Sequence, residues 1–175
     1  MSFILIRIIK QMEIRKSKPT ESYEVKKFYK KLGRKWNTNS QNFKVIAKKN
    51  DEIIGILSID EEKGYPILKE LLVDEAFSSK GIATKILFES ERYLQGKKSY
   101  CIPFVHLKGF YKKFGYEAIE FNKAPIFLKK ALLLNNKPRK YANIERVIIM
   151  RKHRSIENKI TSNIKSHFQD RKVGI

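Results

Sequence analysis

The first half of the chain switches between helical and strand-like spacing of its apolar residues. Four of them share one face of a predicted helix that ends near Gly33: Val25, Phe28, Tyr29 and Leu32. The β-branched runs FKVIAKK and EIIGILSID predict two strands joined by a tight turn at Asn50 and Asp51. A second turn in EEKG leads into the strand-like run YPILKELLVD. With MEIRKSKP as a first strand, this half predicts a strand, a helix and an antiparallel meander.

The second half of the chain alternates helices with strands. Five residues form one face of a long helix that stops at Gly96: Ala83, Ile86, Leu87, Ser90 and Leu94. After the strand-like run KSYCIPFV, four residues predict a short helix closed by Gly115: Leu107, Phe110, Tyr111 and Phe114. YEAIEF, APIFLKKALLL and ERVIIM then predict a strand, a helix and a strand. The order β-α-β-β-β-α-β-α-β-α-β indicates an α/β (α+β) fold.

These elements fit one folded domain at residues 12–151. Residues 1–11 are either an extra N-terminal strand or an extension ahead of Met12. Residues 152–175 predict a basic amphipathic helical tail with an apolar residue at every fourth position: Ile156, Ile160, Ile164 and Phe168. Such a stripe favours docking on the chain's own domain or on a second copy in a homodimer. Contact with nucleic acid or a membrane surface is the alternative.

Composition adds a strong positive charge to this picture. The 175 residues carry a formal net charge of +20 at pH 7, which favours anionic partners. Because the lysines are scattered rather than grouped, we favour a lysine-rich composition with one local anion site over nucleic acid as a partner. The single Cys101 excludes an intramolecular disulfide and fits the reducing cytoplasm. The opening SFILIRII has too few apolar residues to span a membrane.

Small residues gather where the long helix begins, in AFSSKGIATKIL. The first N–H groups of a helix have no partner within the helix, and they bind phosphate well when the backbone can approach it. The residues that suit this role are small, hydroxylated or cationic: Ser78, Ser79, Lys80, Gly81, Ala83, Thr84 and Lys85. Taken alone, such a segment more often serves helix capping or tight packing of a helix on a sheet.

A second segment, GFYKKFGYE, places Tyr111 one turn into the short helix after KSYCIPFV. If the strands before the two helices diverge, a wedge opens between them with both helix starts on one side. A linear ligand could pair with free strand backbone there, with a pyrophosphate on the first helix and its reactive end at Tyr111. Spacing alone favours a core role for Tyr111 beside Phe110 and Phe114.

Together, the element order, LLVDEAFSSKGIATKIL and GFYKKFGYE resemble the GNAT (GCN5-related) N-acetyltransferase superfamily over residues 12–151. Gly81 and Ala83 match the last two fixed places of the family's first motif. Ser78 stands where that motif has Arg or Gln, and Ser79 stands where glycine is common. The resemblance implies the GNAT fold, a mixed and mostly antiparallel sheet of about seven strands flanked by helices. It also implies a V-shaped splay between the fourth and fifth strands.

The resemblance further implies acetyl-CoA as co-substrate, no metal, and direct attack by an amine acceptor in a ternary complex. The pyrophosphate would bind the amides of residues 79–84, and the pantetheine arm would pair with the strand backbone before the loop. The cofactor-binding set is therefore Leu72, Val73, Ser78, Ser79, Lys80, Gly81, Ile82, Ala83, Thr84 and Tyr111. Tyr111 also matches the tyrosine that protonates the departing thiolate in many members.

Glu70, on the strand before the loop, is the favoured general base, and His106 is the alternative. Asp60, Glu61 and Glu62 are expected to decorate a hairpin turn. A non-catalytic GNAT-fold module that binds CoA or nucleic acid is the competing hypothesis, because Ser78 and Ser79 depart from the motif.

Overall fold

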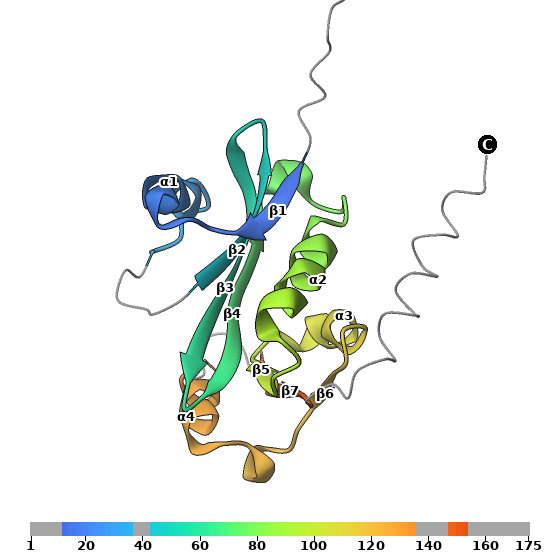
Figure 1. The fold of residues 1–175 in the computed structure, drawn as a ribbon. Helices are drawn as coiled ribbons and strands as arrows, with labels where there is room; N and C mark the ends of the chain where they lie inside the picture. Colours follow the sequence, from blue (N-terminus) through green and yellow to red (C-terminus); the bar gives the residue numbers. More distant parts are fainter. Residues whose placement is uncertain (1–11, 37–42, 136–146, 154–175) are drawn as a thin grey trace, which may run out of the picture.

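The computed structural model describes residues 12–36, 43–135 and 147–153, whose arrangement is shown in Figure 1. The strands are β1 (Glu13–Lys16), β2 (Phe43–Lys49), β3 (Glu52–Glu62), β4 (Tyr65–Val73), β5 (Ser99–Cys101), β6 (Tyr116–Ala118) and β7 (Met150–Lys152). The α-helices are α1 (Ser22–Lys31), α2 (Ile82–Leu94), α3 (Lys108–Lys112) and α4 (Ile126–Asn135). The predicted order of strands and helices is confirmed. Residues 1–11 and the stripe from Ile156 to Phe168 lie outside the described residues.

The strands form one seven-stranded sheet in the order β1-β2-β3-β4-β5-β7-β6. Every neighbouring pair is antiparallel except β4 and β5. That parallel junction joins Ile67 with Tyr100 and Leu68 with Cys101. The mixed sheet and its short parallel junction confirm the predicted fold class, including the splay between the fourth and fifth strands.

Two tight turns set the register of the meander. Asn50 and Asp51 have φ of 53° and 66°, and Lys63 and Gly64 have φ of 54° and 79°. Positive φ at both central residues is the hairpin geometry that matches the twist of the flanking strands. The second predicted turn lies within EEKG, at its last two residues, because β3 stays paired with β4 through Glu62.

Helices cover both faces of the sheet (Figure 1). On one face, α2 and α3 pack with inward residues of the strands in the largest apolar cluster, which includes Ile86, Leu87, Tyr111, Val45 and Leu57. On the other face, α1 packs through Val25 and Phe28 against Ile46. α4 covers the far end of that second face through Leu128, beside Ile67. The alternation of side chains along β2 explains the two faces, because Val45 and its neighbour Ile46 point in opposite directions.

The last three strands are shorter than the apolar runs that predicted them. β5 ends at Cys101, because Pro103 has no N–H for a sheet ladder; its carbonyl accepts from Ile148 N at 3.0 Å. β6 ends at Ala118, and β7 begins only at Met150. Apolar character therefore marked buried segments correctly but overestimated how far the ladder extends.

A cluster of ion pairs anchors the start of α1 to the sheet. Arg15 of β1 donates two hydrogen bonds to the Glu21 carboxylate, at 2.7 and 2.8 Å, and Lys48 of β2 donates a third at 3.1 Å. The Glu21 side chain is buried, and the Arg15 hydrogen bonds hold the pKa of its carboxyl well below the usual value. The cluster thus joins α1, β1 and β2.

Within the described ranges, every helix is too short or too polar to cross a membrane.

Candidate active site

The loop between β4 and α2 turns sharply before the helix starts. Asp74, directly after β4, begins a 3-10 turn (Glu75–Phe77), and its carboxylate accepts from Ala76 N at 3.1 Å. Ser79 and Gly81 then have positive φ of 59° and 72°. Glycine adopts this conformation at no steric cost, so Gly81 allows the chain to enter α2 directly after the turn.

This turn leaves a row of backbone N–H groups free. Among the described residues, the N–H groups of Ser79–Thr84 have no acceptor, and the first that bonds is Lys85 N, to Gly81 O at 3.1 Å. The 13-residue helix α2 begins at the same place, so its partial positive end adds to these donors. Free N–H groups at a helix start form a site suited to a pyrophosphate.

The side chains around the loop leave the backbone accessible. Among the predicted cofactor residues of the loop, four are exposed: Ser78, Ser79, Lys80 and Gly81. Ala83 and Thr84 are half-buried, and Ile82 is buried. The Lys80 ammonium donates to Ala76 O at 3.0 Å and lies 5.1 Å from the Phe77 ring centre. Lys49 lies 5.5 Å from the same ring. Two cations therefore stand beside the loop.

Gly55 on β3 allows α2 to start close to the sheet, and sequence reasoning missed it. A Cβ at this position would lie 2.7 Å from Ile86 Cδ1, 3.2 Å from Ile82 Cγ2 and 3.3 Å from Leu72 O. A larger residue would therefore displace the tip of the Ile86 side chain and crowd Ile82 and the Leu72 carbonyl. A glycine inside an otherwise β-branched strand was the available signal, because such a glycine often marks close approach of another segment.

β4 has an open edge directly before the loop. Its pairing with β5 stops at Leu68, whereas its pairing with β3 continues to Val73, opposite Gly55. Among the described residues, no strand covers the β5 side of residues 69–73. Leu72 and Val73 are half-buried on this segment. Backbone groups of an open edge can pair with an extended ligand, which supports the predicted role of these two residues.

A β-bulge decides which face of the sheet carries Glu70. Ser58 pairs with Glu70 and Ile59 pairs with Leu68, so Lys69 is an extra residue on β4. One extra residue moves the following side chains to the opposite face. Glu70 consequently lies on the α1 face of the sheet, two residues after the pairing of β4 with β5 ends at Leu68.

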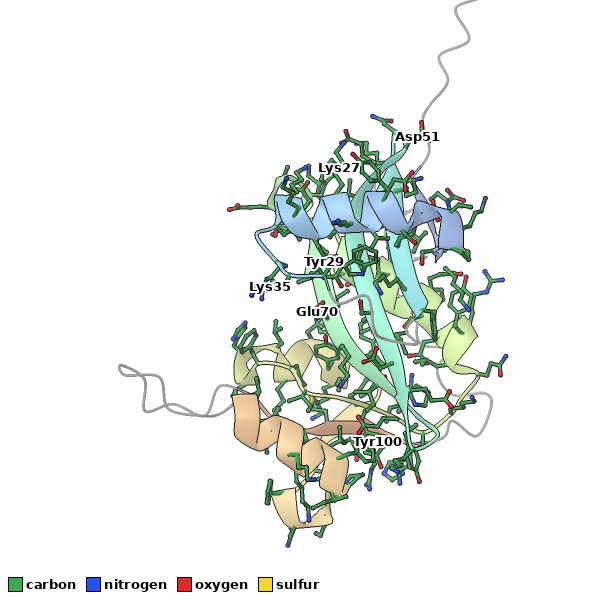
Figure 2. All side chains as sticks on the ribbon, turned by 90° about the vertical axis from the view of Figure 1, so that its left-hand side faces the viewer. Lys27, Tyr29, Lys35, Asp51, Glu70 and Tyr100 are labelled. Carbon is green, nitrogen blue, oxygen red and sulfur yellow. The ribbon has the colours of Figure 1, made fainter. Side chains whose placement is uncertain are left out.

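Tyr29 of α1 binds Glu70 from above the sheet. The Tyr29 hydroxyl donates to Glu70 Oε2 at 2.8 Å and lies 2.9 Å from Ser58 Oγ. Tyr29 and Ser58 are only 2% and 4% exposed, so the hydrogen bond between them is shielded from water, whereas Glu70 is half-buried. Burial raises the pKa of the Tyr29 phenol, and the Glu70 carboxylate raises it further, so the hydroxyl stays protonated. Figure 2 shows Tyr29 on the sheet side of α1, toward Glu70.

Lys44 and Asp60 extend this polar group across the sheet. Lys44 pairs in register with Ser58, and it is buried. Burial lowers the pKa of Lys44, against the attraction of Asp60 and Glu70. Asp60 was expected in a turn, but it lies within β3 and is half-buried, which raises the pKa of its carboxyl. The expectation failed because β3 extends two residues further than its apolar run.

A second bond ties α1 to the cofactor loop. Lys31, in the last turn of α1, donates to Asp74 Oδ2 at 2.5 Å. The Asp74 side chain is 8% exposed, and the Lys31 hydrogen bond lowers the pKa of its carboxyl. Asp74 therefore holds both the loop and the C-terminal end of α1.

Tyr111 lies on the other side of the sheet from Glu70. It is 6% exposed and joins the cluster under α2, with ring centres 5.2 Å from Phe110 and 5.9 Å from Tyr116. Its hydroxyl makes no hydrogen bond with any described residue. Burial raises the pKa of this phenol, so it remains protonated at neutral pH. Tyr111 is therefore both a packing residue and an unengaged proton donor.

His106 does not join this group. It is exposed in a 3-10 turn (Val105–Leu107), and its ring stacks on Phe104 with centres 5.7 Å apart. No carboxylate or hydroxyl in the described part of the chain orients its imidazole. The described residues also contain no group of His, Cys, Asp and Glu that could hold a metal ion.

Comparison with known proteins places these features in a family. Residues 12–125, more than half of the chain, match the family model described as "Acetyltransferase (GNAT) domain". A comparison with curated proteins finds no match.

Solved structures with similar folds are distant in sequence. Ribosomal-protein-S18-alanine N-acetyltransferase from Escherichia coli is 11% identical, with a TM-score of 0.62 over 85% of this chain and 97% of that chain. N-acetylglutamate synthase from Neisseria gonorrhoeae, complexed with coenzyme A and N-acetyl-glutamate, is 10% identical, with a TM-score of 0.63 over 83% of this chain and 35% of that chain. Arabidopsis thaliana Naa50, in complex with a bisubstrate analogue, is 15% identical, with a TM-score of 0.56 over 81% of this chain and 97% of that chain.

Proposed function

The chain belongs to the GNAT acetyltransferase family, and from this premise we propose that it transfers the acetyl group of acetyl-CoA to a primary amine. The amine would attack directly, with both substrates bound at once. The observation that carries the proposal is the open edge of β4, which leads straight into the free N–H groups at the start of α2. Acetyl-CoA supplies an activated acetyl group, as a thioester, when it is bound.

The residues of the loop fit the anionic part of this co-substrate. The free amides of Ser79–Thr84 would hold the pyrophosphate, together with the positive end of α2. Gly81 and the small side chains beside it leave room for close approach of a ligand. Leu72 and Val73 would offer backbone hydrogen bonds to the pantetheine arm. A backbone N–H of the same edge would stabilise negative charge on the acetyl oxygen.

Glu70 is the residue best placed to accept the proton of the amine. Only a neutral amine is a nucleophile, so a carboxylate near the open edge is required directly or through water. Glu70 Oε2 is held by Tyr29, whereas its other oxygen has no hydrogen-bond partner among the described residues. The structure thus supports a fixed base with one oxygen available for the proton. Ser58 holds the Tyr29 hydroxyl in turn.

Tyr111 would act on the leaving group, the sulfur of coenzyme A. Its phenol keeps its proton at neutral pH, and no described residue engages that proton. The hydroxyl can therefore donate it to the sulfur that leaves. With Glu70 taking a proton from nitrogen and Tyr111 giving one to sulfur, the protons of the reaction balance.

Acetyl-CoA binding and turnover are tested separately. Saturation at about 100 times the dissociation constant stabilises the native state by about 2.7 kcal/mol, a shift that thermal denaturation detects. Release of free thiol is then measured over polyamines, amino acids, peptides with free N-termini or Lys, and aminoacyl-tRNA. No thermal shift at saturating acetyl-CoA would refute co-substrate binding. A shift without turnover on any acceptor would instead favour the non-catalytic module.

A further inference from the structure

The expectation that the lysines are scattered fails at α1 and the turn after it, which carry a local excess of positive charge. Residues 22–36 contain six cations and one carboxylate, Glu24. The cations are Lys26, Lys27, Lys30, Lys31, Arg34 and Lys35. All six side chains are exposed. Lys31 forms an ion pair with Asp74. The rest of this charge faces solvent without an ion pair in the described part of the chain.

α2 does not share this excess of positive charge. Its two carboxylates, Glu89 and Glu91, form ion pairs with Arg92 at 3.1 Å and with Lys152 at 2.6 Å. Its cations and carboxylates are equal in number, Lys85 and Arg92 against these two. Unpaired cations are thus unevenly distributed: α2 has none in excess, α3 has a few, and α1 with the turn after it has the longest such run among the described helices.

Helical spacing aligns three of these lysines with an aromatic ring. Tyr23, Lys26, Lys27 and Lys30 lie at i, i+3, i+4 and i+7, so they share one face of α1. The opposite face, with Val25, Phe28 and Tyr29, is buried against the sheet. Tyr23 is 75% exposed. Figure 2 shows Lys27 and Tyr29 at opposite edges of α1, with Tyr29 towards Glu70. We refer to Tyr23, Lys26, Lys27 and Lys30 as the basic ridge.

We propose that the basic ridge binds single-stranded nucleic acid. Three ammonium groups in a row suit backbone phosphates, and binding them releases counterions. The exposed Tyr23 ring in the same row offers a base a surface on which to stack, which is the combination that proteins use for single strands. Bases in a duplex are already stacked on one another, so they cannot reach the ring. A membrane surface fits less well, because an interfacial helix inserts its apolar face and that face of α1 is buried.

α1 borders the side of the sheet that carries Glu70, and the basic ridge lies on the opposite, solvent-facing side of this helix. Tyr29 and Lys31 of the same helix contact Glu70 and Asp74, so a bound strand would run along the helix that borders both groups. Nucleic-acid binding at the ridge does not depend on acetyl transfer, because it is measured without acetyl-CoA. Failure of one proposal therefore leaves the other standing.

The test compares two variants of equal net charge in the full chain. The ridge variant replaces Lys26, Lys27 and Lys30 with Gln. The control variant makes the same change at Lys108, Lys112 and Lys113, which are exposed on α3 and at its C-terminal end, on the other face of the sheet. Binding of a fluorescently labelled, mixed-sequence single-stranded RNA of about 20 nucleotides is followed by anisotropy from low to high salt. Circular dichroism confirms that both variants are folded.

We expect the ridge variant to bind about 10- to 100-fold more weakly at 0.1 M salt, with the slope of log affinity against log salt reduced by about 2. The control should change by less than about 3-fold, because charges on the far face are screened over a Debye length of about 10 Å. Equal losses in both variants would reduce the effect to net charge and overturn the proposal. Absence of RNA binding by the unaltered chain at 0.1 M salt would also overturn it.

The aromatic part and the type of partner have their own tests. Tyr23→Ala should weaken binding about 5-fold or more if a base stacks on the ring, and an unchanged affinity would refute stacking. A duplex of the same sequence should compete less well than the single strand. Tighter binding to vesicles with about one-third phosphatidylserine than to RNA would assign the ridge to membranes and overturn the proposal.

Discussion

Replacing Tyr29 with Phe tests the contact on which the position of Glu70 depends. The change keeps the ring that packs with Val25 and Phe28 and removes only the hydroxyl. Two hydrogen bonds are lost, one of 2.8 Å to the Glu70 carboxylate and one of 2.9 Å to Ser58. A hydrogen bond to a charged group contributes about 1.5–3 kcal/mol, and a neutral one contributes about 0.5–1.5 kcal/mol. Because Ser58 is 4% exposed, water cannot fully replace its lost partner.

We therefore expect Tyr29→Phe to lower the free energy of unfolding by about 2–3 kcal/mol. For a chain of this size, that corresponds to a fall of about 4–12 °C in Tm. Urea denaturation followed by the fluorescence of Trp36, the single tryptophan, measures the change, with the slope m expected to stay constant.

A double-mutant cycle with Ser58→Ala shows whether the loss comes from the network. Removing the Ser58 hydroxyl should cost less free energy in the Tyr29→Phe variant than in the native chain, because its partner is already gone. Acetyl transfer should fall about 10- to 100-fold in kcat with little change in KM for acetyl-CoA, because a displaced base slows the reaction without affecting the loop. A change in stability below about 0.5 kcal/mol, or strictly additive effects of the two substitutions, would refute the proposed positioning of Glu70.

Three further predictions concern the core, the acid and pH. Tyr111→Phe should lower turnover about 100-fold with little change in stability or cofactor affinity, and equal turnover would leave Tyr111 a packing residue. Gly55→Ala should cost about 1–3 kcal/mol in urea denaturation by crowding Ile86, Ile82 and the Leu72 carbonyl, whereas Gly109→Ala in α3, whose Cβ would meet nothing within 4 Å, is the control that should not destabilise. The pKa of Glu21 is lowered in the folded state, so the native chain binds fewer protons than the unfolded chain; this contribution to stability is complete well above the unfolded pKa of about 4.3 and is lost progressively as pH falls from there towards the lowered folded pKa. Glu21→Gln should therefore destabilise the protein more at pH 7 than at pH 3, and an equal loss at both would contradict the linkage.

Several parts of the candidate site were predictable because they depend on short-range chemistry. Gly81 and the small residues near it identified the loop, since small side chains let a ligand approach the free N–H groups of a helix start. Apolar spacing identified α1, α2 and α3, including the helix that carries Tyr111. The limits of β3 and β5 were less accurate, because polar residues also pair in a ladder and a proline can end one.

The contacts around Glu70 were beyond the reach of local patterns. Tyr29 and Glu70 are 41 positions apart, and spacing within either segment does not indicate that they meet. Gly55 was overlooked for the same reason, because the side chains that exclude a Cβ there belong to α2.

The sequence by itself determined the order of the elements, the loop with its free amides and the excess of lysine along α1. Periodicity, turn residues and charge are local properties, so they can be determined from the sequence without knowing the fold. Only the tertiary structure decided that Glu70 faces α1 and Tyr111 faces α2. One extra residue at Lys69 reverses the side-chain direction of the rest of β4, and that register is set by pairing with β3 across the sheet.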